Sequence, residues 1–462
     1  MHDKIQSSSV QGTTRLALQT ERKNAEKLKK PILGIIFAFS LIVPVSFYAG
    51  PLRLPPNMIL LVLVFVPVFF SWVSGKAGRK LPVDYLILAA SLWAALAVLL
   101  SDGLSNTVEP AGVAILQTLG AYLLGRTSVT NTDGLRTIVR VYLIMLTILL
   151  PFAFYETLTE RTLYLDMFRP FGVVYPNLEI EPRGGLERVQ AAFEHPILYG
   201  VFSASGFALV WYSLKKNGTT VFSLYGGLVS VVSSILSVST GAVLGIATQI
   251  LIIGWGWIFR NQPNRWRNLG ILVILMYVSI DAVSNRSPFH VFVDYLTFNS
   301  GSAYNRILIW QYGTAQLFKV PFFGMGVHAP DWERAPFMSS SMDNFWLVVA
   351  VSYGIPGFLF LAGAMIWLLF KIGSRRELDQ RTENLRIGLV ISLIGLFTAI
   401  ASVHLWNSSY CWMMFLVGSS VCLLNEGRDK REIQIEKAAK QREAQENEMR
   451  EARKRRSMRQ SL

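Results

Sequence analysis

Charged residues are scarce in this chain. Asp, Glu, Lys and Arg make up 16% of its 462 residues, whereas a soluble globular protein carries roughly 25%. Apolar residues account for 52%, and they gather in runs of about 17–25, long enough to cross the hydrocarbon of a bilayer as helices. The composition excludes an ordinary soluble enzyme and predicts an all-α polytopic membrane protein.

Cysteine and histidine are rarer still. The two cysteines, Cys411 and Cys422, fall in one apolar run, about three helical turns apart and beyond disulfide reach within one helix. The five histidines show no metal-ligand spacing. We therefore expect neither a disulfide framework nor a metal site, no cofactor, and no nucleic-acid partner.

The apolar runs predict about 12 transmembrane helices. They cover residues 31–48, 56–75, 83–101, 108–125, 137–157, 196–214, 220–236, 241–259, 268–284, 343–370, 387–403 and 407–425. Lys and Arg are concentrated in alternate connections, and the positive-inside rule then sets the orientation. A membrane domain over residues 31–425 is predicted, between cytoplasmic tails at 1–30 and 426–462, the second of which is strongly basic.

Two connections are long, and both fall on the side opposite the tails. Residues 158–195 and 285–342 are the predicted external loops, and both carry arginines against the usual bias. Loops beyond about 15 residues are usually functional or disordered, and the aromatic, Gly and Pro content of these two indicates folded structure. Arginine presents a planar, permanently charged fork that binds phosphate or carboxylate. The loops are thus the predicted site for an anionic ligand, unless the arginines pair with nearby carboxylates or lipid headgroups.

Four stretches, in order along the chain, share a pattern. The first is RVQAAFEHPILYG (188–200), the second SVSTGAVLG (237–245), and the fourth DNFWLVVAVSYGIPGFLF (343–360). The third runs Arg306-x-x-x-Trp310 and continues as Pro321-x-x-Gly324-x-Gly326. Together they resemble the O-antigen ligase and polymerase superfamily over about residues 185–370, in the order of that family and on its expected side of the membrane.

The resemblance implies a metal-independent, integral-membrane glycosyltransferase in the inner membrane of a bacterium. Its donors would be glycans linked to undecaprenyl pyrophosphate, and its other partners membrane lipids and a flippase and chain-length regulator of the same pathway. Matched to the motifs, the catalytic residues would be Arg188, Arg306, His195 and Asp343. The substrate-binding residues would be Trp310, Gly324, Gly326, His328 and Asn344.

Several of these residues also have structural interpretations. His195 precedes a helix-starting proline and suits a helix start, whereas its catalytic interpretation is a phosphate-orienting group or general base. Asp343 suits a helix N-cap or a base for the acceptor hydroxyl. Trp310 suits an interfacial anchor or a sugar-stacking ring, and Gly324 and Gly326 suit a simple turn or a close approach to ligand.

Three functions remain as alternatives. Ligases of the family commonly carry a histidine before the Asn of the helix that follows the large loop, where this chain has Asp343. That difference favours a polymerase of O-antigen or exopolysaccharide repeat units over a ligase that transfers polysaccharide to an acceptor. The third alternative is a 12-helix secondary transporter, because Gly78, Arg79 and Lys80 match part of a major-facilitator loop, although a positive-inside loop explains them equally well.

Overall fold

The computed structural model describes residues 31–50, 52–176, 182–183, 185–215, 221–284, 300–376 and 378–425. Within these residues the protein is mostly helical, and nine helical segments are long and apolar enough to cross a membrane. They are α3 (Pro56–Val73), α4 (Pro82–Asp102), the segment Thr107–Ser128, α7 (Thr132–Thr159), α12 (Thr240–Ile258), α13 (Arg265–Val283), α16 (Phe345–Gly373), α17 (Gln380–Ile400) and α18 (Asn407–Ser420, continuing to Asn425). A mostly helical fold with membrane-spanning helices is therefore confirmed, whereas the predicted count of about 12 is not. The two predicted tails lie outside the described residues.

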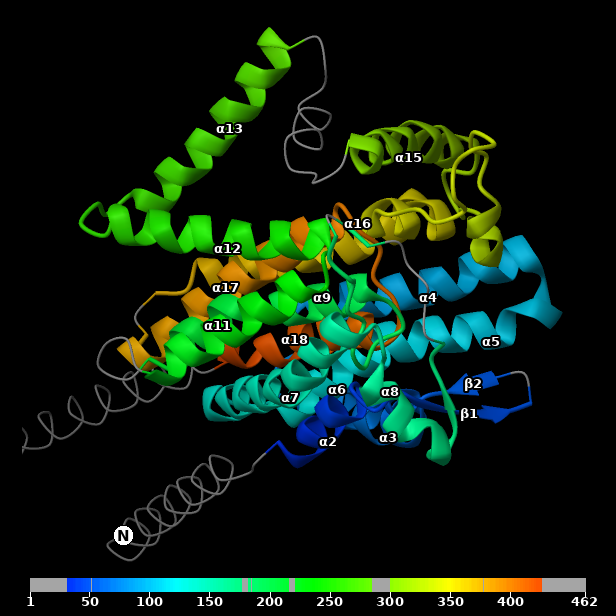
Figure 1. The fold of residues 1–462 in the computed structure, drawn as a ribbon, viewed down its shortest axis with the longest axis horizontal. Helices are drawn as coiled ribbons and strands as arrows, with labels where there is room; N and C mark the ends of the chain where they lie inside the picture. The colour runs from blue at the N-terminus through cyan, green and yellow to red at the C-terminus, as the bar shows by residue number, and fades with distance from the viewer. Residues whose placement is uncertain are drawn as a thin grey trace, which may run out of the picture.

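Most of the long helices lie side by side, whereas α13 projects away from them (Figure 1). The segment Thr107–Ser128 consists of α5 (Leu104–Ile115), a π-helical turn η1 (Leu116–Gly120) and α6 (Ala121–Ser128), and α6 packs on α18. Gly418 allows this contact, since a Cβ there would collide with the carbonyl oxygen of Tyr122. Small residues at helix interfaces let two backbones approach in this way.

The first predicted span, 31–48, is a helix only at its start. Helix α2 (Ile32–Ser40) ends before Pro44, and the chain then enters strand β1 (Val45–Ala49). This strand lies between β2 (Leu52–Leu54) and β3 (Val173–Val174) in an antiparallel sheet of order β2-β1-β3. Proline lacks the N–H that a helix interior needs, so a hydrophobic run of sufficient length does not form one spanning helix here.

The predicted span 196–214 is broken into α9 (Pro196–Ala204) and α10 (Phe207–Ser213). At the break, the hydroxyl of Tyr142 donates to the carbonyl of Ser203 at 2.7 Å and accepts the N–H of Gly206 at 3.2 Å. Irregular backbone at membrane depth requires such internal partners. The next predicted span is the 16-residue helix α11 (Val221–Leu236), so three of the predicted helices are short or interrupted.

Both long loops contain the folded structure that was expected, within their described residues. The first holds α8 (Leu163–Phe168), the 3-10 turn η2 (Arg169–Phe171) and strand β3. The second holds the 20-residue helix α15 (Ser300–Lys319) and the 3-10 turn η3 (Gly326–Asp331). Helix α15 packs along α16, and the β1–β2 hairpin lies toward the same end of the molecule (Figure 1).

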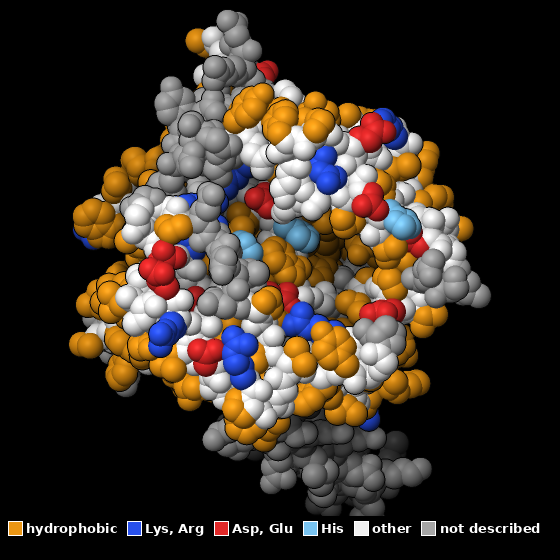
Figure 2. All heavy atoms as spheres, turned by 45° about the vertical axis from the view of Figure 1, so that its right-hand side comes forward, with side chains coloured by type: hydrophobic (Ala, Val, Ile, Leu, Met, Phe, Trp, Pro, Cys, Tyr) orange, Lys and Arg blue, Asp and Glu red, His pale blue; other side chains and the backbone are white. Residues whose placement is uncertain are grey.

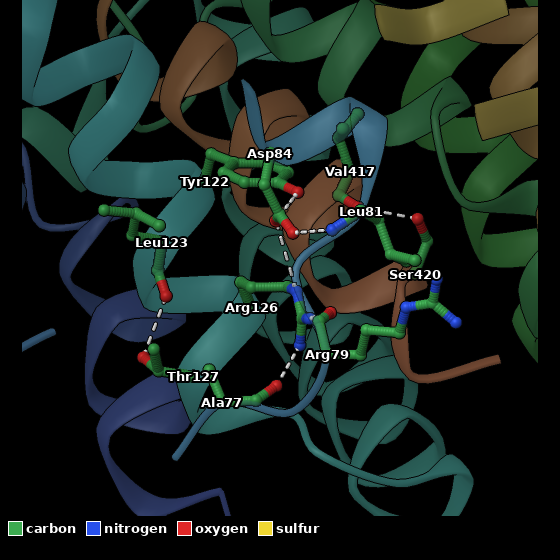
Figure 3. A network of polar contacts seen from close by, with 10 residues as sticks. All are labelled: Ala77, Arg79, Leu81, Asp84, Tyr122, Leu123, Arg126, Thr127, Val417 and Ser420. Atoms are coloured by element: carbon green, nitrogen blue, oxygen red, sulfur yellow. Dashed lines mark hydrogen bonds and ion pairs between the residues drawn. The ribbon is translucent and has the colours of Figure 1, made fainter. Parts of the chain in front are cut away.

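A buried ion pair fixes the connection between α3 and α4 (Figure 3). The carboxylate of Asp84 accepts hydrogen bonds from the Tyr122 hydroxyl at 2.5 Å and the Leu81 N–H at 2.7 Å, and lies 3.3 Å from Arg126 Nε. Arg126 also donates to the carbonyl of Arg79 at 2.8 Å. A buried pair is stable when its remaining hydrogen bonds are satisfied, as here. The Gly-Arg-Lys stretch at 78–80 is thus one side of a structural contact.

Candidate functional site

The segment that carries Arg188 is held in place by a buried carboxylate. Glu156, near the end of α7, accepts the backbone N–H groups of Gln190 at 2.8 Å and Ala191 at 3.0 Å. Ala191 itself has a φ of 50°, a conformation that costs energy for an L-residue and requires such support. The carbonyl of Leu236, at the end of α11, accepts a further N–H from this segment. These bonds fix the backbone on which Arg188 is mounted.

Two arginines lie together at this segment. Arg183 Nη1 reaches the carbonyl of Val238 at 3.5 Å, so the Ser/Thr/Gly turn between α11 and α12 borders the site. Arg188 Nε and Nη2 are buried without a hydrogen-bond partner among the described residues. Burial and, to a smaller extent, the charge of Arg183 lower the pKa of Arg188 to about 10, against the opposing charge of Asp343. Arg188 is therefore a cation whose Nε and Nη2 donors are not used by the described part of the chain.

Arg306 enters the site from α15. Only 7% of it is exposed, and its Nε donates to the carbonyl of Ser402 at 3.1 Å, in the connection between α17 and α18. Burial lowers the pKa of Arg306, and the charge of Asp343 again opposes the shift. The two predicted catalytic arginines, from separate loops, thus share Asp343 as an electrostatic neighbour.

Asp343 is not the N-cap of α16. That role belongs to Asn344, whose side-chain oxygen accepts the N–H of Leu347 at 3.1 Å. The capping interpretation of Asp343 was wrong because the two adjacent residues suit the cap equally, and the backbone turns so that Asn344 occupies it. Asp343 instead accepts the Ser341 hydroxyl at 2.8 Å. Its charge acts on four groups of the site: Arg188, His195, Arg306 and His404.

His195 caps α9, as its structural interpretation predicted. Its Nδ1 accepts the N–H of Ile197 at 3.1 Å, so a neutral ring carries its proton on Nε2. Burial, together with the charge of Arg188, lowers the pKa of His195 to about 4. The ring is therefore a neutral hydrogen-bond donor at Nε2. This geometry favours the phosphate-orienting role over the general-base role.

Three residues of the site were not identified from the sequence. Trp406 lies between two histidines, with ring centroids 5.9 Å from His195 and 5.4 Å from His404. Glu194 accepts the Trp406 indole N–H at 2.8 Å and forms an ion pair with Arg53 at 3.4 Å. A signal was present, because the short connection at 401–406 falls on the predicted side of the two long loops and contains a histidine and a tryptophan.

The Pro-x-x-Gly-x-Gly turn lies against α4 and α16, away from the contacts just described. Gly324 and Gly326 have φ values of 70° and 57°, and a Cβ on them would collide with the Val351 carbonyl and with Asp102 respectively. His328 Nε2 lies 3.1 Å from Asp102 Oδ1. The described contacts therefore agree with the turn interpretation of both glycines and give His328 a role in attaching the loop to α4.

Trp310 follows Arg306 by one turn of α15 and is 39% exposed. Its partly exposed position near Arg306 agrees with a role as an interfacial anchor and with a role as a sugar-stacking ring. Figure 2 shows a hollow on this end of the molecule, with histidine side chains inside it and acidic and basic side chains around it. A ligand can thus approach such groups from outside.

No family model matches this chain, and no curated protein matches it. Function is therefore argued from the site itself. Fixed guanidinium groups beside neutral imidazoles and a carboxylate can bind a ligand with several anionic oxygens and stabilise charge that develops on it.

Proposed function

We propose that this protein polymerises lipid-linked oligosaccharide repeat units into surface polysaccharide at the outer face of a bacterial inner membrane. The donor would carry its glycan on undecaprenyl pyrophosphate. The observation that carries the proposal is the convergence of Arg183, Arg188 and Arg306 from two loops, with donors of Arg188 left unused by the described residues. A diphosphate presents the anionic oxygens that such a cluster binds.

The same arrangement supports catalysis as well as binding. When the bond between the anomeric carbon and the diphosphate breaks, negative charge grows on the leaving oxygen. The Arg306 guanidinium is held by the Ser402 carbonyl, and the backbone that carries Arg188 is fixed by Glu156, so both arginines are positioned before the reaction. Preorganised donors of this kind each contribute about a hundredfold to a thousandfold in rate.

Helix α7 supports an external position for the site. Arg136, in its first turns, belongs to the basic connection that was predicted to be cytoplasmic, and Glu156 at its other end clamps the Arg188 segment. The two residues are 20 positions apart (156 minus 136) on one helix, which is roughly 30 Å, the thickness of the hydrocarbon core. The site and the basic connection are then expected at opposite faces of the membrane.

The test uses purified protein in lipid nanodiscs with repeat units on undecaprenyl pyrophosphate. A polymerase yields a ladder of glycan lengths on a gel, and Arg188→Ala and Arg306→Ala should remove it. Arg161→Ala, a change to an exposed residue outside the motifs, is the matched control and should leave the ladder intact. Normal ladders from both site variants at normal abundance would contradict the proposal.

The same assay separates the alternatives. A ligase would transfer one glycan to a distinct acceptor lipid and give no ladder from repeat units alone. A transporter would form no glycosidic bond under any of these conditions.

A further inference from the structure

The connection between α17 and α18 and two aromatic rings hold His404 in place. Its neighbours in the connection between α17 and α18 are anchored, since the Val403 carbonyl accepts the Phe345 N–H at 3.1 Å and the Ser402 carbonyl accepts Arg306 Nε. Its ring lies nearly parallel to two aromatic rings, Phe345, with centroids 6.2 Å apart at 20°, and Trp406, with centroids 5.4 Å apart at 23°. These rings orient the imidazole, and its nitrogens are the polar atoms that His404 offers to a ligand.

The Nδ1 atom of His404 has no use within the described part of the fold. It is buried without a hydrogen-bond partner there, a situation that costs about 1–3 kcal/mol. The other histidine beside Trp406 differs, because Nδ1 of His195 already accepts the N–H of Ile197. Burial lowers the pKa of His404 to about 4, against the opposing charge of Asp343, so its ring is neutral at pH 7 and one ring nitrogen carries a free lone pair.

We propose that His404 is a catalytic residue of the transfer reaction and removes the proton from the acceptor sugar hydroxyl. This inference rests on the proposed function. In the step, the hydroxyl oxygen forms a bond to the anomeric carbon of the donor glycan, and the bond from that carbon to the diphosphate oxygen breaks. The electron pair of the broken bond leaves with the lipid diphosphate, and the hydroxyl proton passes to His404 Nδ1.

The charged residues of the site then have separate roles. Arg188 and Arg306 stabilise the departing diphosphate, whereas Asp343 stabilises the imidazolium that forms on His404. Asp343 is then a positioning and electrostatic residue, and the acceptor base predicted from the sequence moves from Asp343 to His404. The acceptor group is then a neutral sugar hydroxyl, which must lose its proton to a base when it is glycosylated.

Three substitutions test the proposal in the nanodisc polymerisation assay. His404→Phe keeps an aromatic ring for the stack with Phe345 and Trp406 but has no nitrogen, so abundance should be normal and transfer should fall about a hundredfold to ten-thousandfold. His404→Asn keeps a hydrogen-bond acceptor near the Nδ1 position but no base, and a similar loss is expected. His404→Ala leaves space beside the acceptor, and added imidazole should restore part of its activity.

Donor binding is measured in parallel, with undecaprenyl pyrophosphate carrying one repeat unit as the probe. All three variants should bind it like the wild type, because His404 acts on the acceptor, whereas Arg188→Ala should bind it poorly. Normal transfer by His404→Phe, or no rescue of His404→Ala by imidazole, would overturn the assignment and leave the proposed function standing. A wild-type protein that neither binds nor transfers the donor would instead refute the proposed function, and this inference with it.

Discussion

Replacing Arg188 by methionine should separate function from folding. The substitution removes a guanidinium whose Nε and Nη2 are buried without a partner among the described residues, and keeps a flexible chain that can fill the same space. Burial and the charge of Arg183 lower the pKa of Arg188 to about 10. The folded protein thus holds this proton less tightly than the unfolded chain does, which means that the charge destabilises the folded state at neutral pH.

The size of the effect follows from that shift. The lowering of the Arg188 pKa to about 10 corresponds to roughly 3 kcal/mol, at about 1.36 kcal/mol per pKa unit. Partial contact with solvent screens the charge, so the net gain from removing it is on the order of 1–2 kcal/mol. We therefore expect the Tm of Arg188→Met in detergent to be unchanged or raised by roughly 1–4 °C. Polymer synthesis should nevertheless fall about a hundredfold to a thousandfold.

Arg126→Met is the matched control. Arg126 is also buried, but its donors are used by Asp84 and by the carbonyls of Ala77 and Arg79. Removing it leaves Asp84 as an uncompensated buried charge, which costs roughly 3–5 kcal/mol, so Tm and membrane abundance should both drop. A parallel loss of Tm and activity in Arg188→Met would refute the reasoning, because it would show that the Arg188 guanidinium stabilises the fold.

Four further predictions follow from particular contacts. Arg306→Lys keeps the charge but loses the Nε–H that binds the Ser402 carbonyl, so polymer synthesis should fall at least about tenfold and further in Arg306→Ala; normal synthesis by the lysine variant would show that charge alone suffices. Gly354→Ala should lower membrane abundance on immunoblots, because Gly354 has a φ of 73° and a Cβ there meets the Phe322 carbonyl, whereas Gly363→Ala, with open space around it, should not. Burial lowers the pKa of both His195 and His404 to about 4 from 6.5. As the pH falls, the unfolded chain therefore binds protons before the folded protein does, so Tm should be highest above pH 6.5 and fall toward pH 4. The decrease should be less steep in the double variant His195→Asn/His404→Phe. An unchanged slope in that variant would exclude these two histidines as the cause. Reporter fusions after residues 175 and 430 should report opposite sides of the membrane, and a common side would overturn the proposed topology.

Much of the fold class could be read from the sequence because it depends on local properties. A run of about twenty apolar residues has few alternatives to a helix in lipid, and the nine long apolar segments of the described residues correspond to predicted runs. The predicted helix bounds are wrong where a helix is interrupted and a side chain from a distant helix binds the exposed backbone groups. The division of 196–214 depends on Tyr142, which bonds both Ser203 and Gly206. That partner is more than fifty residues away in the chain.

In the candidate site, too, the sequence predicted what depends on single segments but not what depends on contacts between distant segments. The sequence by itself determined that the chain has the long apolar helices of a membrane protein. It also drew attention to the arginines of the two predicted external loops and their motif neighbours, Arg188, His195 and Arg306, because residue type and spacing are local properties. Only the tertiary structure decided that Asn344, and not Asp343, caps α16, and that the Gly324 and Gly326 turn attaches to α4 and α16. Only it, too, brought the connection between α17 and α18, which carries His404, to Arg306 and Phe345. Such contacts depend on how helices far apart in sequence pack together, and no pattern within a single segment encodes them.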